Sequence, residues 1–66
     1  MHKMFGKIVK ELRTENRLLQ KELAAELGVG RTTVVSWETG QYEPDLETLE
    51  KIADYFGVTT DYLLGR

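Results

Sequence analysis

The amino-acid sequence predicts an all-α fold of five short helices, and three observations carry this prediction. Apolar residues recur at three- and four-residue steps, which places them on one face of a helix. Four of the six glycines directly follow such a segment, as helix-ending glycines do. No run of residues alternates between apolar and polar in the way that predicts a strand. We therefore expect residues 1–66 to form one small helical domain.

The first predicted helix runs from about Met4 to Glu15. Charged residues such as Lys7 and Glu11 occupy its polar face. Its apolar residues form one stripe for burial, made of Phe5, Ile8, Val9 and Leu12. The segment is thus an amphipathic helix that packs by one face.

The second and third predicted helices, from about Gln20 to Leu27 and from about Arg31 to Thr39, are joined by a tight turn. Gly28 ends the second helix at a position of positive φ, which a Cβ atom opposes. Ala24 is small where the two helices cross. Apolar residues lie where helices crossing at roughly 90–120° must meet. They are Leu23, Leu27, Val29, Val34 and Trp37. This pattern is typical of a DNA-binding helix-turn-helix.

The fourth predicted helix runs from Leu46 to Phe56, with Asp45 as its N-cap. Its apolar stripe consists of Leu46, Leu49, Ile52, Ala53 and Phe56. A last short helix begins near Thr60, capped by Thr59 or Thr60, and carries apolar residues before Gly65. Connections of two to six residues favour closely packed helices.

Size and composition exclude several classes of protein. A chain of 66 residues buries only about 60% of its unfolded surface, so its stability depends on one core. It has no cysteine, which excludes disulfides and thiolate metal sites. No apolar run approaches the ~20 residues that span a bilayer, and the charged N-terminus lacks the apolar segment of a signal peptide. We therefore expect a soluble protein of the cytoplasm.

Catalytic and metal-binding residues are scarce. The one histidine, His2, lies near the N-terminus, and no set of His, Cys, Asp and Glu has the spacing of metal ligands. We interpret Glu47, Glu50 and Asp54 as the solvated face of the fourth helix rather than as a metal site. We therefore expect no enzymatic activity, no metal and no cofactor.

The net charge of −2 is unevenly distributed. Residues 1–31 hold seven Lys or Arg against four Glu, which gives +3, whereas residues 32–66 hold two against seven acids, which gives −5. The basic residues of the first half are Lys3, Lys7, Lys10, Arg13, Arg17, Lys21 and Arg31. A positive surface for nucleic acid can therefore coexist with a negative total. An ordinary mixed surface is the alternative.

The third predicted helix has an outward face suited to reading DNA bases. Val34 and Trp37 share its inward face by their i, i+3 spacing. The residues that then point outward are Arg31, Thr32, Val35 and Ser36. An arginine can donate two hydrogen bonds to guanine, hydroxyl groups can bond base edges, and a valine can pack on a thymine methyl. The alternatives are solvated polar positions and, for Val35, a contact with a partner protein.

Four motifs extend over almost the whole chain, from Phe5 to Gly65. They are F-G-x-I-x-x-x-L-R from Phe5, Q-x-E-L-A-x-x-L-G-V from Gln20, W-E-x-G from Trp37, and P-D-L-E-T-L-x-K-I-A from Pro44. Together with the ending G-V-T-T-D-Y-L-L-G, they resemble the lambda-repressor/Cro-type (XRE) family of helix-turn-helix domains. The resemblance implies a compact five-helix lambda-repressor-like domain, with the helix-turn-helix at the second and third helices, that binds double-stranded DNA.

The resemblance also implies roles for three polar residues. Gln20 contacts the DNA backbone and braces a residue of the recognition helix, and the free N–H groups of its helix turn suit a phosphate. Arg13 and Glu38 form a partly buried ion pair that ties the first helix to the third. A side-chain cap is the alternative role for Gln20. Further candidates for contact with the DNA backbone are Lys21, Arg17, Thr33, Thr39 and Gln41.

Two positions depart from the family pattern. Leu19 and Gly30 stand where family members usually have a Ser or Thr that caps the following helix. The loss of such a cap costs ~0.5–2 kcal/mol unless Asn16 or another group replaces it, although Gly is tolerated at this position.

The sequence therefore predicts a sequence-specific transcriptional regulator, most simply a repressor. One short helix offers few base contacts, so we expect a homodimer on a pseudo-palindromic operator, with residues 31–39 in the major groove. Candidate dimer residues are Tyr42, Tyr55, Tyr62, Leu63 and Leu64, with core packing as the alternative for the two leucines. We expect no small-molecule ligand and no membrane partner. The second hypothesis is a protein-interaction module of the same fold, an antitoxin or adaptor, which the acidic second half favours.

Overall fold

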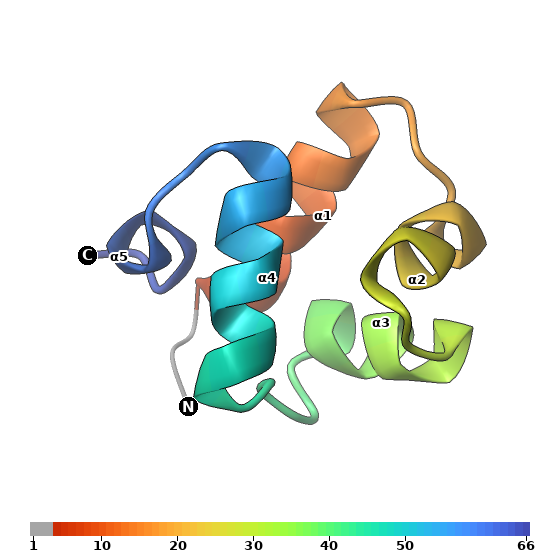
Figure 1. Ribbon diagram of the computed structural model, residues 1–66. Coiled ribbons are helices and arrows are strands. Elements are labelled where there is room, and N and C mark those ends of the chain that lie inside the picture. Colours follow the sequence, from red (N-terminus) through yellow and green to blue (C-terminus); the bar gives the residue numbers. More distant parts are fainter. Residues whose placement is uncertain (1–3) are drawn as a thin grey trace.

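The computed structural model describes residues 4–66, which form five α-helices and no strand (Figure 1). The helices are α1 (Phe5–Glu15), α2 (Gln20–Leu27), α3 (Arg31–Thr39), α4 (Leu46–Phe56) and α5 (Thr60–Leu63). The all-α prediction is confirmed. The predicted first helix begins one residue too early, because Met4 is the N-cap of α1 rather than its first residue. His2 and Lys3 lie outside the described residues.

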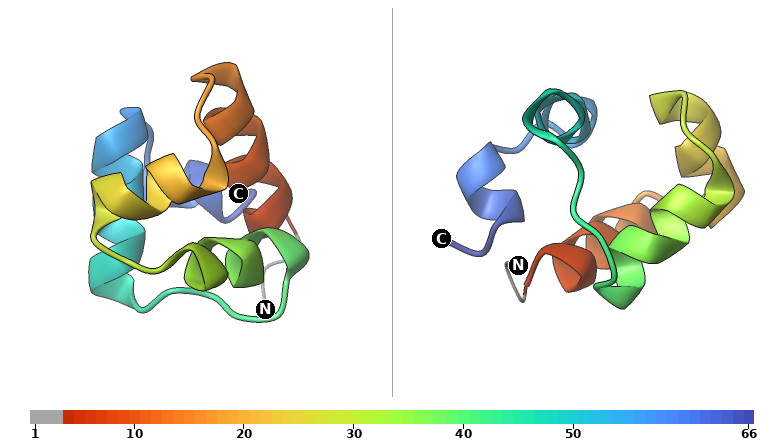
Figure 2. Two further views of the ribbon diagram at one scale, coloured as in Figure 1. Left: turned by 90° about the vertical axis from the view of Figure 1, so that its right-hand side faces the viewer. Right: turned by 90° about the horizontal axis from the view of Figure 1, so that it is seen from below.

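The helices are arranged around one hydrophobic core. In Figure 1, α2 and α3 lie to the right of the molecule and α5 to the left. Figure 2, seen from below, shows α3 alongside α1, with α4 on the opposite side of the core. α3 packs against both α1 and α2, whereas α5 packs against α4 and α1. The helix with the predicted base-reading face is therefore held by the first two helices of the chain.

All five helices contribute buried side chains to the core. Phe5 of α1 meets Trp37 of α3 edge to face, with ring centroids 6.5 Å apart. Partly buried residues at the margin of the core include Val29 and Phe56. One predicted core position is wrong: Leu46 is 70% exposed, because it opens α4 beyond the point where that helix meets the core.

Gly6 allows α1 and α3 to approach each other at backbone distance. A Cβ atom at Gly6 would overlap the carbonyl oxygen of Trp37 and would lie 3.0 Å from that of Glu38. Both obstacles are backbone atoms, which cannot rotate away as a side chain can. The glycine in the F-G motif therefore fixes how closely the end of α3 lies against α1.

The N-termini of α4 and α5 are capped by side chains as predicted. The Asp45 carboxylate accepts a hydrogen bond from the Thr48 backbone N–H at 2.9 Å. Hydrogen bonding from Thr48, by its side chain first and by this N–H second, lowers the pKa of Asp45 below its ordinary value, because both bonds favour the ionised form. Thr59 Oγ1 accepts from the Tyr62 N–H at 3.0 Å, so Thr59 rather than Thr60 caps α5.

α2 lacks a capping side chain at Leu19 and uses a different contact. The Glu22 carboxylate, three residues into the helix, accepts a hydrogen bond from the Leu19 N–H at 2.7 Å. This is one half of a capping box. Asn16 does not act as the substitute cap: its Nδ2 donates to the Leu12 carbonyl of α1 at 2.7 Å.

Candidate nucleic-acid interface

The outer face of α3 carries the predicted base-reading residues. Val34 and Trp37 are buried beneath it. Arg31 and Thr32 are exposed, whereas Val35 and Ser36 are half-buried. The Ser36 hydroxyl donates to the Thr32 carbonyl at 2.9 Å, one helical turn back. Because its hydrogen is used within the helix, Ser36 presents acceptor lone pairs to a ligand.

An open groove of about 460 Å³ runs along one side of this face. Thr32, Thr33 and Ser36 line it from α3. The opposite wall is the α3–α4 connection, from Tyr42 to Asp45. The polar row of α3 is therefore flanked by a loop that contains carboxylates, on the side where the chain becomes acidic.

A polar cluster formed by Arg13, Gln20 and Glu38 joins the first three helices beneath this face. Arg13 of α1 holds the Glu38 carboxylate of α3 at both oxygens: Nε lies 2.7 Å from Oε2, and Nη2 lies 3.1 Å from Oε1. Gln20 of α2 donates its amide Nε2 to the same Oε1 at 3.1 Å. The side chains of Arg13 and Glu38 are only 10% and 4% exposed. We call these three residues the polar cluster.

The polar cluster also fixes the turn between α1 and α2. Arg13 Nη1 donates to the Leu18 carbonyl at 2.8 Å. Within residues 4–66, no buried side-chain nitrogen or oxygen lacks a hydrogen-bond partner, so the buried charges are fully satisfied. The angle between α3 and the two preceding helices therefore depends on directional bonds as well as on apolar packing.

Gln20 connects the polar cluster to the surface. It is half-buried in the first turn of α2, and one of its two amide hydrogens points to Glu38. The second amide hydrogen remains for another acceptor. The sequence predicted that Gln20 contacts a residue of the third helix but not which one. That residue is Glu38.

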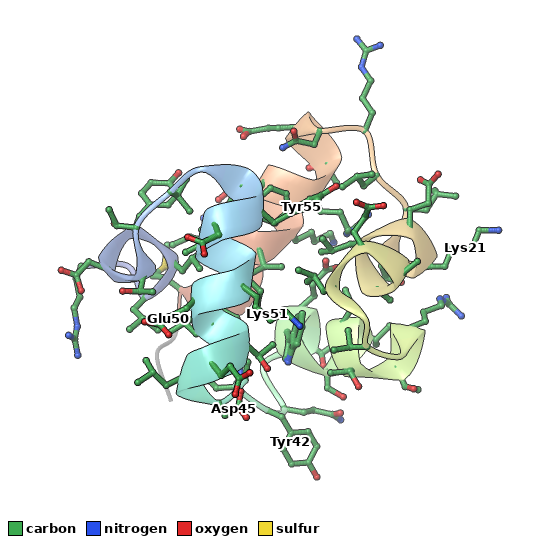
Figure 3. The ribbon with its side chains drawn as sticks, viewed as in Figure 1. Lys21, Tyr42, Asp45, Glu50, Lys51 and Tyr55 are labelled. Carbon is green, nitrogen blue, oxygen red and sulfur yellow. The ribbon has the colours of Figure 1, made fainter. Side chains whose placement is uncertain are left out.

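Three basic side chains near the polar cluster and α3 have no acidic partner among residues 4–66. The side chains of Arg17, Lys21 and Arg31 are exposed, and within the described part of the chain none makes a hydrogen bond or ion pair. Figure 3 shows Lys21 projecting from α2 away from the body of the molecule. These charges are available to a ligand.

The other predicted backbone-contacting residues lie around α3. Thr33 is exposed on the first turn. The Thr39 hydroxyl donates to the Val35 carbonyl at 2.9 Å, which leaves its oxygen as an acceptor. Gln41 is exposed in the loop after α3, where its backbone N–H donates to the Ser36 carbonyl at 3.0 Å. The Gln41 amide is a better donor to phosphate than the Thr39 hydroxyl, because the hydroxyl hydrogen of Thr39 is already used within α3.

The predicted dimer residues do not form one patch. Leu63 is 0% exposed and belongs to the core, so its assignment to a dimer surface is wrong. Leu64 is half-buried against the core. Tyr42, Tyr55 and Tyr62 are exposed. However, Tyr42 precedes α4 and Tyr55 is near its C-terminal end, as Figure 3 shows, which puts about 15 Å of helix between them.

Two contacts of the site were not predicted, although the sequence contained a signal for each. Glu22 stands at the third position of α2, where a capping box places a glutamate. Gly6 lies inside an amphipathic helix, where a glycine is unfavourable unless another backbone comes close. A glycine in the first turn of an amphipathic helix, as at Gly6, is thus a usable signal for a close helix contact.

Comparison with known proteins assigns the chain to a family. A family model described as Helix-turn-helix matches residues 9–63. The chain therefore belongs to the helix-turn-helix family of lambda-repressor/Cro (XRE) type, and the resemblance predicted from its motifs is confirmed. The match begins within α1 and ends at the last residue of α5, so it includes the polar cluster and the outer face of α3.

Three curated relatives illustrate the similarity. The transcriptional repressor RstR of the cryptic phage CTXphi of Vibrio cholerae is 44% identical over 55 residues, which are 83% of this chain and 50% of that protein. The transcriptional activator BcrR of Enterococcus faecalis is 42% identical over 61 residues, which are 92% of this chain and 30% of that protein. YonR, an uncharacterized SPbeta prophage-derived transcriptional regulator of Bacillus subtilis, is 43% identical over 61 residues, 92% of this chain and 56% of that protein.

These relatives are longer than the region they share with this chain. The chain spans between 30% and 56% of their lengths.

The matched family and the named relatives are DNA-binding transcriptional regulators and not enzymes. In residues 4–66, no helix is long and apolar enough to cross a membrane. Glu47, Glu50 and Asp54 are exposed along α4.

Proposed function

We propose that the protein is a sequence-specific transcriptional repressor that acts in the cytoplasm. In this proposal a homodimer binds a pseudo-palindromic operator in double-stranded DNA, with α3 of each chain in a major groove. The observation that carries the proposal is the outer face of α3, which is polar, accessible and held at a fixed angle by the polar cluster. Direct readout requires this combination of accessible donors and a rigid support.

The proposed base-reading residues are Arg31, Thr32, Val35 and Ser36. Arg31 supplies a bidentate donor for guanine O6 and N7. Ser36 supplies an acceptor for the amino group of adenine or cytosine, because its own hydrogen is used by Thr32. Val35, half-buried at the surface, supplies an apolar contact for a thymine methyl.

The proposed contacts with the DNA backbone position α3 in the groove. Gln20 donates its second amide hydrogen to a phosphate while Glu38 holds the first. Lys21, Thr33, Thr39 and Gln41 lie around the same edge. Phosphate contacts fix orientation and do not discriminate sequence, so they affect all duplexes alike.

The proposed dimer uses exposed aromatic residues outside the base-reading face. Tyr62 on α5 and Tyr55 near the end of α4 are close in the chain, and α4 packs against α5. Tyr42 is 69% exposed at the other end of α4, next to the groove. A Tyr62→Ala variant should weaken dimer formation on DNA without unfolding the chain, and sedimentation of the DNA complex measures this.

The proposal is tested by selecting duplexes from a random pool and measuring affinity for the enriched sequence. Arg31→Ala should weaken binding by about 1–3 kcal/mol and relax specificity at one base pair. Lys51→Ala removes the same charge from an exposed position on α4 and is the matched control. Figure 3 shows Lys51 and Glu50 on opposite sides of that helix. Equal effects of the two substitutions would contradict specific readout by α3.

The salt dependence gives a second test of DNA binding. A dimer that neutralises ~6–10 phosphates should lose ~10³–10⁵-fold in affinity between 50 and 200 mM salt. A salt-insensitive interaction, or failure to enrich any duplex, would refute the proposal. Transcription from a promoter that contains the enriched sequence should fall when the protein is added, and a rise would identify an activator instead.

A further inference from the structure

The turn between α1 and α2 contains a backbone conformation that arginine adopts at a cost. Among residues 4–66, Arg17 is the one non-glycine residue with positive φ, at 58°. Its backbone N–H donates to the Thr14 carbonyl, and the next N–H, of Leu18, donates to the Arg13 carbonyl, each at 3.0 Å. This pair of bonds is a Schellman motif, in which the left-handed position is usually glycine. In this conformation the Cβ atom crowds the backbone.

The ends of α2, α3 and α4 show the usual solution. Their left-handed positions are Gly28, Gly40 and Gly57. At each of these glycines a Cβ atom would meet no atom within 4 Å, so a larger side chain would fit in the space there. Glycine at these positions is therefore explained by the backbone conformation and not by a lack of space. α5 is likewise followed by a left-handed glycine, Gly65, so α1 differs from the other four helix ends because an arginine occupies its left-handed position.

Among residues 4–66, the Arg17 side chain has no polar partner that explains this difference. It is exposed, and the described part of the chain offers it no hydrogen bond or ion pair. Its backbone, in contrast, is firmly held, because Arg13 Nη1 donates to the carbonyl of the following residue, Leu18, at 2.8 Å. The same guanidinium binds Glu38 of α3. The position of Arg17 is thus coupled to that of the recognition helix through one side chain.

We propose that Arg17 is a phosphate-binding residue and that its left-handed conformation lowers the stability of the fold. It stands three residues before Gln20, on the turn that leads into α2, and a guanidinium binds phosphate oxygens through paired donors. This inference rests on the proposed DNA binding, and it adds that Arg17 increases the affinity for DNA while it decreases the stability of the fold. The turn fixes the backbone at Arg17, so that only the side chain has to be ordered when the phosphate binds.

The inference predicts opposite effects of one substitution on stability and on binding. Arg17→Gly should raise Tm by about 4–8 °C, because it relieves the left-handed conformation. It should also lower affinity roughly tenfold at low salt and reduce the slope of log affinity against log salt by about one per bound chain. The loss should be equal on the enriched duplex and on a duplex of shuffled sequence, because a phosphate contact carries no sequence information.

A matched variant moves the arginine within the molecule. Arg17→Gly combined with Gly57→Arg keeps the composition and net charge, and it places an arginine at another left-handed position with open space (φ 68°). Gly57 follows α4 at the end opposite the α3–α4 connection. This double variant should have a Tm close to that of the original chain but should bind DNA as weakly as Arg17→Gly. Arg17→Lys should keep the salt slope.

Each outcome decides the inference. If the double variant binds as well as the original chain, the arginine acts through net charge and the proposal is wrong. An unchanged Tm in Arg17→Gly would show that the left-handed conformation of Arg17 does not lower stability, and the inference would then be wrong. If Arg31→Ala abolishes specific binding while Arg17→Gly changes neither affinity nor salt slope, the inference fails and the proposed function stands. If the original chain binds no duplex, both fail.

Discussion

The two halves of the molecule are stabilised in different ways. α1, α2 and α3 are connected by directional contacts between residues distant in sequence: the polar cluster and the close backbone approach at Gly6. In α4 and α5, the side-chain hydrogen bonds of Asp45 and Thr59 are caps that act within one helical turn. These two helices are held to the rest by buried apolar residues.

This difference matches the proposed division of work. A helix that reads bases needs a defined orientation to within a small angle, and hydrogen bonds and close backbone contacts define orientation better than apolar contacts do. α4 and α5 need only to close the core. The charge follows the same boundary: residues 1–40 hold seven Lys or Arg against five Glu, which gives +2, whereas residues 41–66 hold two against six acids, which gives −4. Four substitutions, ordered from the largest expected effect to the smallest, test this comparison.

Glu38→Ala should cause the largest loss of stability. It strands the buried guanidinium of Arg13 and removes the acceptor of Gln20, and breaking a buried pair in this way costs about 3–5 kcal/mol. The free energy of unfolding from urea titration, followed by circular dichroism, measures this cost. The double variant Arg13→Met with Glu38→Leu should recover most of it, because no charge is left unpaired. A loss below about 1 kcal/mol for Glu38→Ala would show that the polar cluster is not needed for stability.

Leu63→Ala should produce the corresponding loss in the C-terminal half. The side chain is fully buried, and such a truncation costs about 2–5 kcal/mol. Leu46→Ala is the control, because this leucine is 70% exposed and its truncation should change the free energy of unfolding by no more than about 0.5 kcal/mol. Similar effects of the two substitutions would mean that Leu46 has a buried partner, such as a second chain.

Gly6→Ala should destabilise the contact between α1 and α3 by about 1–3 kcal/mol, because the added methyl group meets backbone carbonyls. Gly30→Ala provides the comparison. Its Cβ would meet only Thr32 Oγ1, at 3.7 Å, so Gly30→Ala should cost no more than about 1 kcal/mol, from the weaker N-cap that alanine makes. Thermal unfolding of both variants measures the difference. A Gly6→Ala variant as stable as Gly30→Ala would contradict the close approach of the two helices.

Asp45→Asn should have the smallest effect, visible only in acid. The pKa of Asp45 is lowered in the folded protein by its hydrogen bond to Thr48, so its contribution is present above the unfolded pKa and is lost as pH falls through the folded one. Asparagine caps helices about as well but does not titrate. Tm followed downward from about pH 5 should therefore fall less steeply in Asp45→Asn than in the original chain. Parallel curves would show that the cap does not respond to pH.

Local patterns in the sequence predicted most of the fold. The bounds of α2, α3 and α4 follow from apolar spacing, a glycine after each helix and, for α4, the cap at Asp45. These signals act within a few residues, so they can be read without knowing the tertiary structure. Leu46 was misplaced because spacing alone does not show how far a core extends along a helix.

The parts of the site that depend on distant residues could not be predicted in the same way. Family resemblance predicted the pairing of Arg13 with Glu38, but not that Gln20 shares the same carboxylate oxygen. The left-handed conformation of Arg17 contradicts the usual preference for glycine, so no local rule predicts it. Such exceptions to local preference are expected at functional positions.

We infer that DNA contacts the first three helices and the loop at Gln41, and not α4 or α5. Backbone amide chemical shifts of the isotopically labelled chain, followed during titration with the enriched duplex, test this claim directly. We expect the largest shift changes in the α1–α2 turn, at Gln20 and Lys21, and along Arg31–Ser36. Changes centred instead on Glu47–Asp54 of α4 would contradict it.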